Sequence, residues 1–195
     1  MNKNIISVIF LVSAFWLIFQ FQAYAQENNA KILIAYFSHT GNTRFFAERI
    51  QTLTGGDIVE IKTVHPYPDD YDSVVDKARE EQDKGFRPKI KAIMKNTGSY
   101  DVLFVGYPSW WGTMPMAMFT FFDQNSFKGK IIIPFTTHEG SYFGRSIDDL
   151  RKLNPGSTIK KGLAVRGRSV KSKSVLKDIH SWIKELGYFK KNGDQ

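Results

Sequence analysis

Short apolar runs and amphipathic segments alternate along the chain after residue 30. The apolar runs, such as Ile-Ile-Ile at 131–133, are typical of strands buried on both faces of a parallel sheet. The amphipathic segments repeat apolar residues at helical spacing, as Ile179, Trp182 and Ile183 do. The pattern predicts strands at 31–37, 57–62, 101–107, 130–135 and 158–165, and helices at 43–53, 72–84, 88–96, 116–122, 146–153 and 170–186.

Strands that alternate with helices form a parallel sheet with helices on both faces. The predicted fold class is therefore α/β, a three-layer doubly wound domain with a five-stranded parallel sheet. Ligands of such sheets bind beyond the carboxyl ends of the strands. The loops that follow those ends here, at 38–43, 108–113 and 136–144, are the candidate binding site.

The first of these loops, Ser38–Thr43, joins a predicted buried strand to a helix start. The first turn of a helix has unpaired N–H groups and a partial positive charge, and both favour an anion. Its hydroxyl and amide side chains add donors, and Gly41 permits a sharp turn. The sequence contains neither GxxxxGK[ST] nor GxGxxG, which argues against a nucleoside-triphosphate loop and a dinucleotide site. The loop therefore indicates a phosphate site or an ordinary helix N-cap, which favours the same residue types.

The run from Tyr36 to Ala47, YFSHTGNTRFFA, resembles the FMN phosphate loop of the flavodoxin family. That loop reads aromatic, any, Ser or Thr, two of any, small, any, Thr, three of any, Ala. Ala35 departs from the larger apolar residue that usually precedes it. The resemblance covers nearly all of the chain after residue 30. It implies FMN as the cofactor, the strand order 2-1-3-4-5, and phosphate binding by Ser38, Thr40, Asn42 and Thr43.

The resemblance also gives roles to the second and third loops. Trp110 and Trp111 offer flat faces for stacking on the isoalloxazine ring, with Gly112 beside it, although one or both indoles could instead pack as core. Thr137, His138 and Gly140 would bind the pyrimidine end of the ring. The complete set of candidate cofactor-binding residues is Ser38, His39, Thr40, Gly41, Asn42, Thr43, Pro108, Ser109, Trp110, Trp111, Gly112, Thr113, Thr137, His138, Glu139, Gly140, Ser141 and Tyr142.

Two residues of the third loop depart from the Gly-rich pattern of the family. Glu139 adds a negative charge that would oppose a reduced anionic flavin, and Tyr142 could stack on the flavin or block substrate entry. His138 is a structural hydrogen-bonding residue or a proton donor to a substrate. No catalytic residue is assigned, and no His, Asp and Glu cluster has the spacing of metal ligands.

The N-terminus has the anatomy of a secretory signal peptide. Lys3 precedes a long apolar run, and Ala23-Tyr24-Ala25 is a small-x-small cleavage site. The predicted organisation is a signal peptide at 1–25, a linker at 26–30, a flavodoxin-like domain at 31–190 and a tail at 191–195. Localisation is then periplasmic or secreted. The alternative is a membrane anchor formed by an uncleaved N-terminal segment.

The formal charge of +8 and the absence of Cys narrow the partners and the chemistry. Without Cys, disulfides, thiolate metal sites and Cys nucleophiles are excluded. A basic surface suits an acidic redox partner, although Lys-rich faces are often simply solvated. Nucleic acid is not expected as a partner, because the chain is predicted to be exported and has no nucleic-acid-binding motif.

These observations predict an FMN-binding flavodoxin-like redox protein that acts in electron transfer outside the cytoplasm. One alternative is an enzyme that reduces quinones or related electrophiles with a nicotinamide donor. A second is a binding protein that keeps the fold, has lost the flavin and binds another anion.

Overall fold

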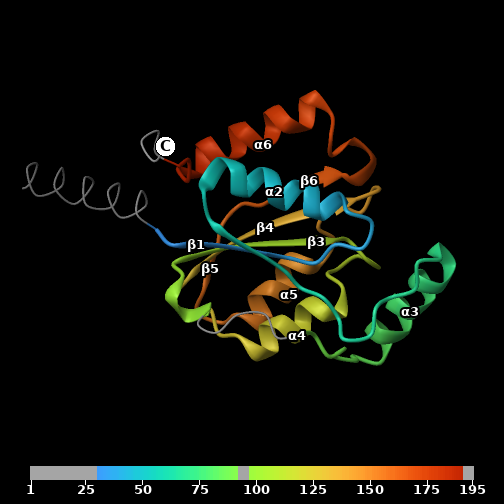
Figure 1. Ribbon diagram of the computed structural model, residues 1–195. Coiled ribbons are helices and arrows are strands. Elements are labelled where there is room, and N and C mark those ends of the chain that lie inside the picture. The colour runs from blue at the N-terminus through green and yellow to red at the C-terminus, as the bar shows by residue number, and fades with distance from the viewer. Residues whose placement is uncertain (1–29, 92–96, 191–195) are drawn as a thin grey trace, which may run out of the picture. The chain divides into compact units, whose positions relative to one another are not determined.

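The computed structural model describes residues 30–91 and 97–190 (Figure 1). Its strands are β1 (Ile32–Tyr36), β2 (Asp57–Glu60), β3 (Val102–Pro108), β4 (Ile131–His138), β5 (Thr158–Ile159) and β6 (Leu163–Arg166). Its α-helices are α2 (Asn42–Thr54), α3 (Tyr71–Asp83), α4 (Met116–Gln124), α5 (Ser146–Leu153) and α6 (Lys173–Leu186). Short 3-10 turns lie at Thr97–Ser99 and Gly167–Ser169.

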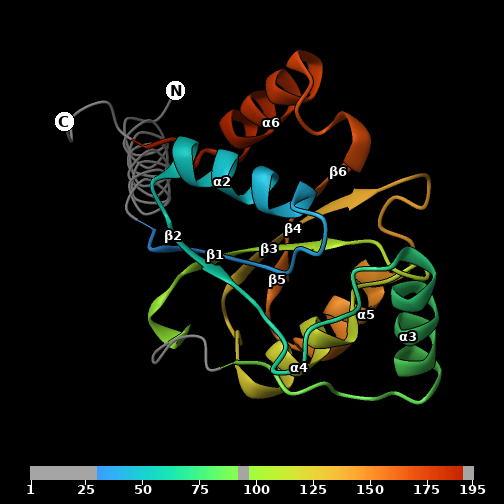
Figure 2. The same cartoon turned by 45° about the vertical axis from the view of Figure 1, so that its right-hand side comes forward.

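The strands form one parallel sheet in the order β2-β1-β3-β4-β5, with β6 also paired to β4. The predicted fold and strand order are confirmed. Helices α2 and α6 cover one face of the sheet, and α4 and α5 cover the other (Figures 1 and 2). The sheet order reverses between β1 and β3, so the loops that follow these two strands diverge there and leave room for a ligand.

The fifth predicted strand, 158–165, is interrupted and forms β5 and β6. Three residues lie between Ile159 and Leu163, but only two lie between their partners Ile132 and Phe135 on β4, so the outer strand carries an extra residue. Pro134 lies opposite this break and has no N–H to donate to the ladder. A Cβ at Gly162 would lie 2.2 Å from the Pro134 carbonyl oxygen, so the close approach needs glycine.

The fourth strand is longer than predicted, because Thr136–His138 continue β4 instead of starting a loop. Thr137 accepts a hydrogen bond from the Ser109 amide, and Thr136, Thr137 and His138 pair in register with β6. Pairing on both sides therefore holds these polar residues in a strand. The prediction of a loop from residue 136 is wrong by three residues.

The predicted helix at 88–96 is not found where the structure describes it. Residues 88–91 are not helical, Ile90 forms an isolated antiparallel bridge with Thr63, and 92–96 lie outside the described residues. The last helix begins at Lys173 rather than 170, because the Ser172 hydroxyl caps it by accepting from the Val175 amide.

The core has one layer on each face of the sheet. Phe46, Phe104, Phe135 and Trp182 pack between the sheet and the α2–α6 pair. The opposite layer is larger and aliphatic as well as aromatic, and its buried members include Leu103, Val105, Met118, Phe121 and Leu150. Both faces of the central strands are thus buried, as continuous apolar strand sequences require.

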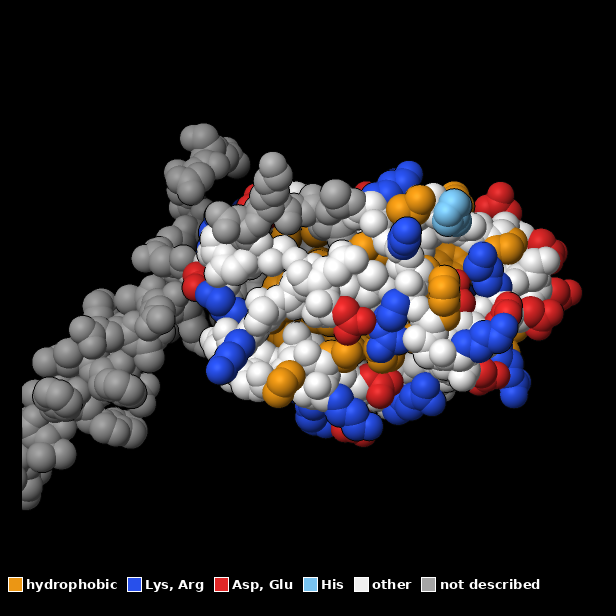
Figure 3. Space-filling view, turned by 90° about the horizontal axis from the view of Figure 1, so that it is seen from below, with side chains coloured by type: hydrophobic (Ala, Val, Ile, Leu, Met, Phe, Trp, Pro, Cys, Tyr) orange, Lys and Arg blue, Asp and Glu red, His pale blue; other side chains and the backbone are white. Residues whose placement is uncertain are grey.

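Figure 3 shows the face that carries α4 and α5, where basic and acidic side chains are interspersed. The positive surplus of the chain is therefore not gathered in one patch on this face. Among the residues that the structure describes, no helix combines the length and apolar character needed to cross a bilayer. The predicted signal peptide or anchor at 1–25 and the tail at 191–195 lie outside the described residues.

Candidate functional site

A cavity of about 580 Å³ opens at the carboxyl ends of the strands. All three predicted loops contribute to it, together with α3 and the turn after β6. Its size lies in the range of small-molecule and cofactor sites. The lining residues are His39, Thr40, Asn42, Tyr71, Val74, Val75, Ala78, Pro108, Ser109, Trp110, Trp111, Thr137, His138, Glu139, Gly140, Ser141 and Gly167.

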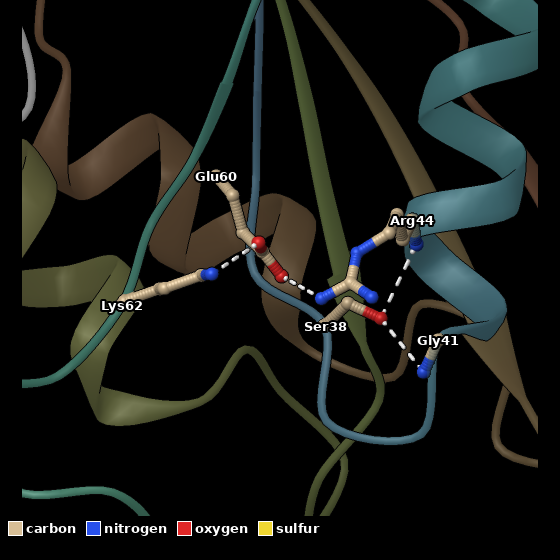
Figure 4. A network of polar contacts seen from close by, with 5 residues as sticks. All are labelled: Ser38, Gly41, Arg44, Glu60 and Lys62. Carbon is tan, nitrogen blue, oxygen red and sulfur yellow. Dashed lines mark hydrogen bonds and ion pairs between the residues drawn. The ribbon is translucent and has the colours of Figure 1, made fainter.

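The first loop is folded around the hydroxyl of Ser38. Its oxygen accepts from the amides of Gly41, at 3.1 Å, and Arg44, at 3.2 Å (Figure 4). Gly41 has φ 88°, which only glycine adopts without strain. The amides of Thr40, Asn42 and Thr43 donate to no acceptor within the described residues. The start of α2 thus presents free donors of the kind that bind anions.

The basic side chain at the start of α2, Arg44, is already paired. The Arg44 guanidinium donates to Glu60 at 2.6 Å, and Glu60 also contacts Lys62 at 3.0 Å (Figure 4). Burial and the Glu60 carboxylate raise the pKa of Tyr36 nearby. The loop therefore offers mainly backbone and hydroxyl donors to an anion.

Thr43 connects the first loop to the third. Its hydroxyl is buried and lies 2.8 Å from the Thr137 hydroxyl at the end of β4. Thr43 does not line the cavity, so its side chain aligns two loops and its backbone amide remains the donor that could reach a ligand. A buried hydroxyl pair of this kind fixes the relative position of the elements that carry it.

The second loop is a tight two-residue turn. Trp110 and Thr113 exchange both backbone hydrogen bonds, at 2.9 and 3.0 Å, and the central residues Trp111 and Gly112 have φ 48° and 76°. This is the type I′ geometry, which favours glycine or asparagine, so Trp111 is strained there. Strain of this kind is typical of functional sites.

The two tryptophans have different surroundings. Trp110 is partly buried and makes edge-to-face contacts with Phe37, Tyr67 and His39 at centroid distances of 5.5, 5.0 and 5.9 Å. Trp111 is 45% exposed. Trp110 therefore belongs partly to the core and partly to the cavity wall, whereas Trp111 forms its rim.

Helix α3 holds the indole of Trp111 from outside. The indole N–H donates to the Val75 carbonyl at 2.9 Å, and the Arg79 guanidinium lies 4.6 Å from its ring centre. These contacts offset part of the backbone strain at Trp111.

The third loop carries a buried imidazole. His138 is 5% exposed and its Nδ1 atom has no hydrogen-bond partner among the described residues. The ring of Tyr142 lies over it, with centroids 4.4 Å apart and a tilt of 34°. Burial, and secondarily the Arg166 guanidinium, lower the pKa of His138.

The carboxylate of Glu139 is paired with Arg168. Its carboxylate accepts from the Arg168 amide at 3.0 Å and lies 3.8 Å from the Arg168 guanidinium, while its carbonyl accepts from Arg166. The predicted opposition of Glu139 to a negatively charged ligand is thus weakened by its neighbours.

One wall of the cavity was not predicted. Tyr71, Val74, Val75 and Ala78 of α3 line it, because α3 lies beyond the strand ends instead of flat on the sheet (Figures 1 and 2). The sequence indicates that Val74, Val75 and Ala78 form an inner face, but not what that face contacts. Gly167 is a further unpredicted lining residue, and its sequence context gave no signal.

Of the predicted site residues, six do not line the cavity. Ser38, Gly41 and Thr43 shape the first loop, and Tyr142 covers His138. Gly112 accepts from the Arg145 amide, and the Thr113 hydroxyl donates to Asp149 at 2.6 Å. The other predicted residues line the cavity: His39, Thr40, Asn42, Pro108, Ser109, Trp110, Trp111, Thr137, His138, Glu139, Gly140 and Ser141.

The fold and the cavity define a doubly wound α/β protein with a ligand site at the switch point of its sheet. The family profile described as Flavodoxin matches residues 31–186. The chain belongs to the flavodoxin family. A search of the curated proteins finds no match.

Solved structures agree with this assignment. A Bacteroides eggerthii protein provisionally described as a flavoprotein is 36% identical, with a TM-score of 0.70 over 81% of this chain and 98% of its own. A similarly described Bacteroides uniformis protein is 28% identical, with a TM-score of 0.70 over 80% of this chain and 98% of its own. A Lactobacillus acidophilus flavoprotein crystallised with FMN is 24% identical, with a TM-score of 0.60 over 74% of this chain and 99% of its own.

Proposed function

We propose that the cavity binds FMN and that the protein is a redox carrier acting in electron transfer. The observation that carries this proposal is that a single cavity is lined both by a turn with free backbone amides and by two tryptophans. A phosphate needs the first and a flat aromatic ring favours the second. Membership of the flavodoxin family and the FMN complex of the Lactobacillus acidophilus relative support it.

The residues present fit FMN in each part of the cavity. The free amides of Thr40, Asn42 and Thr43 would hold the phosphate, in a loop that the Ser38 hydroxyl shapes. Trp110 and Trp111 would bound the ring, and the end of β4 with the following loop would hold its pyrimidine edge. The cofactor would supply the redox chemistry, and the protein its orientation and electrostatics.

The test is FMN titration of residues 26–195, followed by flavin and tryptophan fluorescence. We expect micromolar or tighter binding with mutual quenching, because the indoles border the ring site. Ser38→Ala should weaken binding about tenfold, since it removes the acceptor that shapes the turn. Thr52→Ala is the matched control, because its hydroxyl bonds only to Glu48 within α2. Absence of binding at micromolar FMN would refute the proposal and favour an anion-binding protein without flavin.

A reductase is the second candidate, favoured by the α3 wall. Val74, Val75 and Ala78 give the cavity an apolar side that the three cofactor loops do not account for. A planar electrophile such as a quinone could lie against it, with a nicotinamide as electron donor. Steady-state turnover with both substrates separates the candidates, because a carrier gives negligible direct turnover.

We further propose that the protein works outside the cytoplasm, from the signal-like residues 1–25. N-terminal sequencing of protein recovered from a host's exported fraction tests this. A start near Gln26 supports cleavage. An intact N-terminus in the membrane fraction supports the anchor instead, and an intact N-terminus in the cytoplasmic fraction contradicts export.

A further inference from the structure

His138 has the one unsatisfied buried side-chain nitrogen or oxygen among the described residues. Buried polar atoms are normally hydrogen-bonded, because leaving one unpaired in a low-dielectric interior is costly. The orphan atom is Nδ1, on a ring that lines the cavity. A buried imidazole with an unpaired nitrogen at a cavity wall indicates that a bound ligand supplies the missing partner or charge.

The charges around the imidazole favour an anionic ligand. Arg166 is paired in register with His138, and Arg168 follows on the adjoining turn. Glu139 is the neighbouring carboxylate, and it is bound by the Arg168 amide and guanidinium. Two guanidinium groups thus stand against one carboxylate, which leaves a local surplus of positive charge.

The other neighbours add no charge that would stabilise an imidazolium. Tyr142 covers the ring, and the second cavity histidine, His39, lies against Trp110. The buried Thr43–Thr137 hydroxyl pair is neutral. In the free protein His138 is therefore neutral near pH 7, since burial and Arg166 both lower its pKa.

We propose that His138 takes up one proton from water when FMN bound in this cavity is reduced, and releases it on oxidation. This inference rests on the proposed FMN site. Added negative charge on the ligand offsets the repulsion from Arg166 and compensates the desolvation of the imidazolium. His138 thereby acts as a proton-holding residue that touches the cofactor.

The step balances with dithionite as the reductant. Two electrons pass from dithionite to the bound ligand, and two protons come from water. One proton enters the ring system and the other stays on His138. The net charge of the complex is then unchanged, which avoids an uncompensated charge in a buried site.

The experiment combines NMR with affinity measurements on residues 26–195. The protonation of His138 is followed by imidazole NMR in the free protein and in anaerobic complexes with oxidised and dithionite-reduced FMN. Affinities for both forms are measured from about pH 7 to about pH 8.5, where the FMN phosphate is already a dianion. Parallel measurements use His138→Gln and, as the matched control, His180→Gln, because His180 is exposed on α6, packs on Phe189 and does not line the cavity.

We expect His138 to be protonated near pH 7 only in the reduced complex. Affinity for reduced FMN should fall up to about tenfold per pH unit as pH rises, because one proton is taken up on binding. This dependence should survive in His180→Gln and vanish in His138→Gln. If His138→Gln does not fold, the NMR titration of the unmodified protein decides the question.

Two outcomes overturn the inference and are distinguishable. Binding of both FMN forms with His138 neutral throughout overturns the proton uptake alone. Failure to bind FMN in either form overturns the proposed function, and the inference with it.

Discussion

Tyr67 and Glu81 form a buried pair behind the tryptophan wall, and Tyr67→Phe is the sharpest test of how that wall is held. The Tyr67 hydroxyl donates to a Glu81 carboxylate oxygen at 2.5 Å, and both residues are buried. The Tyr67 ring contacts Phe37 and Trp110 at 5.7 and 5.0 Å. The substitution keeps these ring contacts and removes only the donor.

We expect Tyr67→Phe to lower the free energy of unfolding by about 2 kcal/mol. This is the value of a hydrogen bond to a charged group plus part of the desolvation of the Glu81 carboxylate, which loses its donor. For a domain of this size that lowers Tm by about 4 to 8 °C. Tyr100→Phe is the matched control, because the Tyr100 hydroxyl donates to Asp57 at 2.7 Å and Asp57 is exposed. Water can replace that donor, so the control should cost less than about 1 kcal/mol.

The cost of Tyr67→Phe should depend on pH. Burial raises the pKa of Glu81, whereas the bond from Tyr67 lowers it, so the substitution raises it further. The folded state then binds more protons than the unfolded state between the two pKa values, and stability falls as pH rises through that window. Urea unfolding at about pH 5 and about pH 8 should show the larger deficit at the higher pH. A deficit equal to that of Tyr100→Phe, or one that shrinks as pH rises, would refute the reasoning.

Three further substitutions test separate parts of the molecule. Gly106→Ala would place a Cβ 2.1 Å from the Phe135 ring, so we expect a loss of more than about 3 kcal/mol or failure to fold, measured by thermal unfolding. Thr43→Val leaves the Thr137 hydroxyl buried without a partner and should cost about 1 to 2 kcal/mol in urea, with weaker FMN binding; an unchanged midpoint would contradict the loop link. Trp111→Asn relieves the positive φ but removes the rim indole, so we expect unchanged or higher stability with less flavin quenching; equal quenching would exclude Trp111 from the ring site.

The sheet was predictable because each central strand is apolar on both faces and helical segments alternate with the strands. The loops at its carboxyl ends followed from the same alternation, and α5 begins and ends at the predicted residues, Ser146 and Leu153. The end of β4 was not predictable, because polar residues there are held in the strand by pairing with β3 and β6. The local sequence does not show which strands a segment pairs with, or in which register.

The sequence was sufficient to predict which loops form the site, but not most of the contacts that their side chains make. The pattern of α3 indicates which of its faces is buried, but a helix can turn that face to a sheet or to a cavity, and only the tertiary position decides. The link between Thr43 and Thr137 and the unpartnered Nδ1 atom of His138 depend on atoms far apart in sequence. Neither has a signature along the chain.

The interruption between β5 and β6 has a consequence for behaviour in solution. This strand lies at the margin of the sheet, where exposed backbone donors and acceptors can recruit a strand from another molecule. The extra residue at the break, next to Pro134, splits the margin into segments of two and four residues. Segments this short give an incoming strand few consecutive hydrogen bonds. The same irregularity that lets the backbone pass close to Pro134 therefore makes this margin of the sheet a poor template for pairing with another molecule.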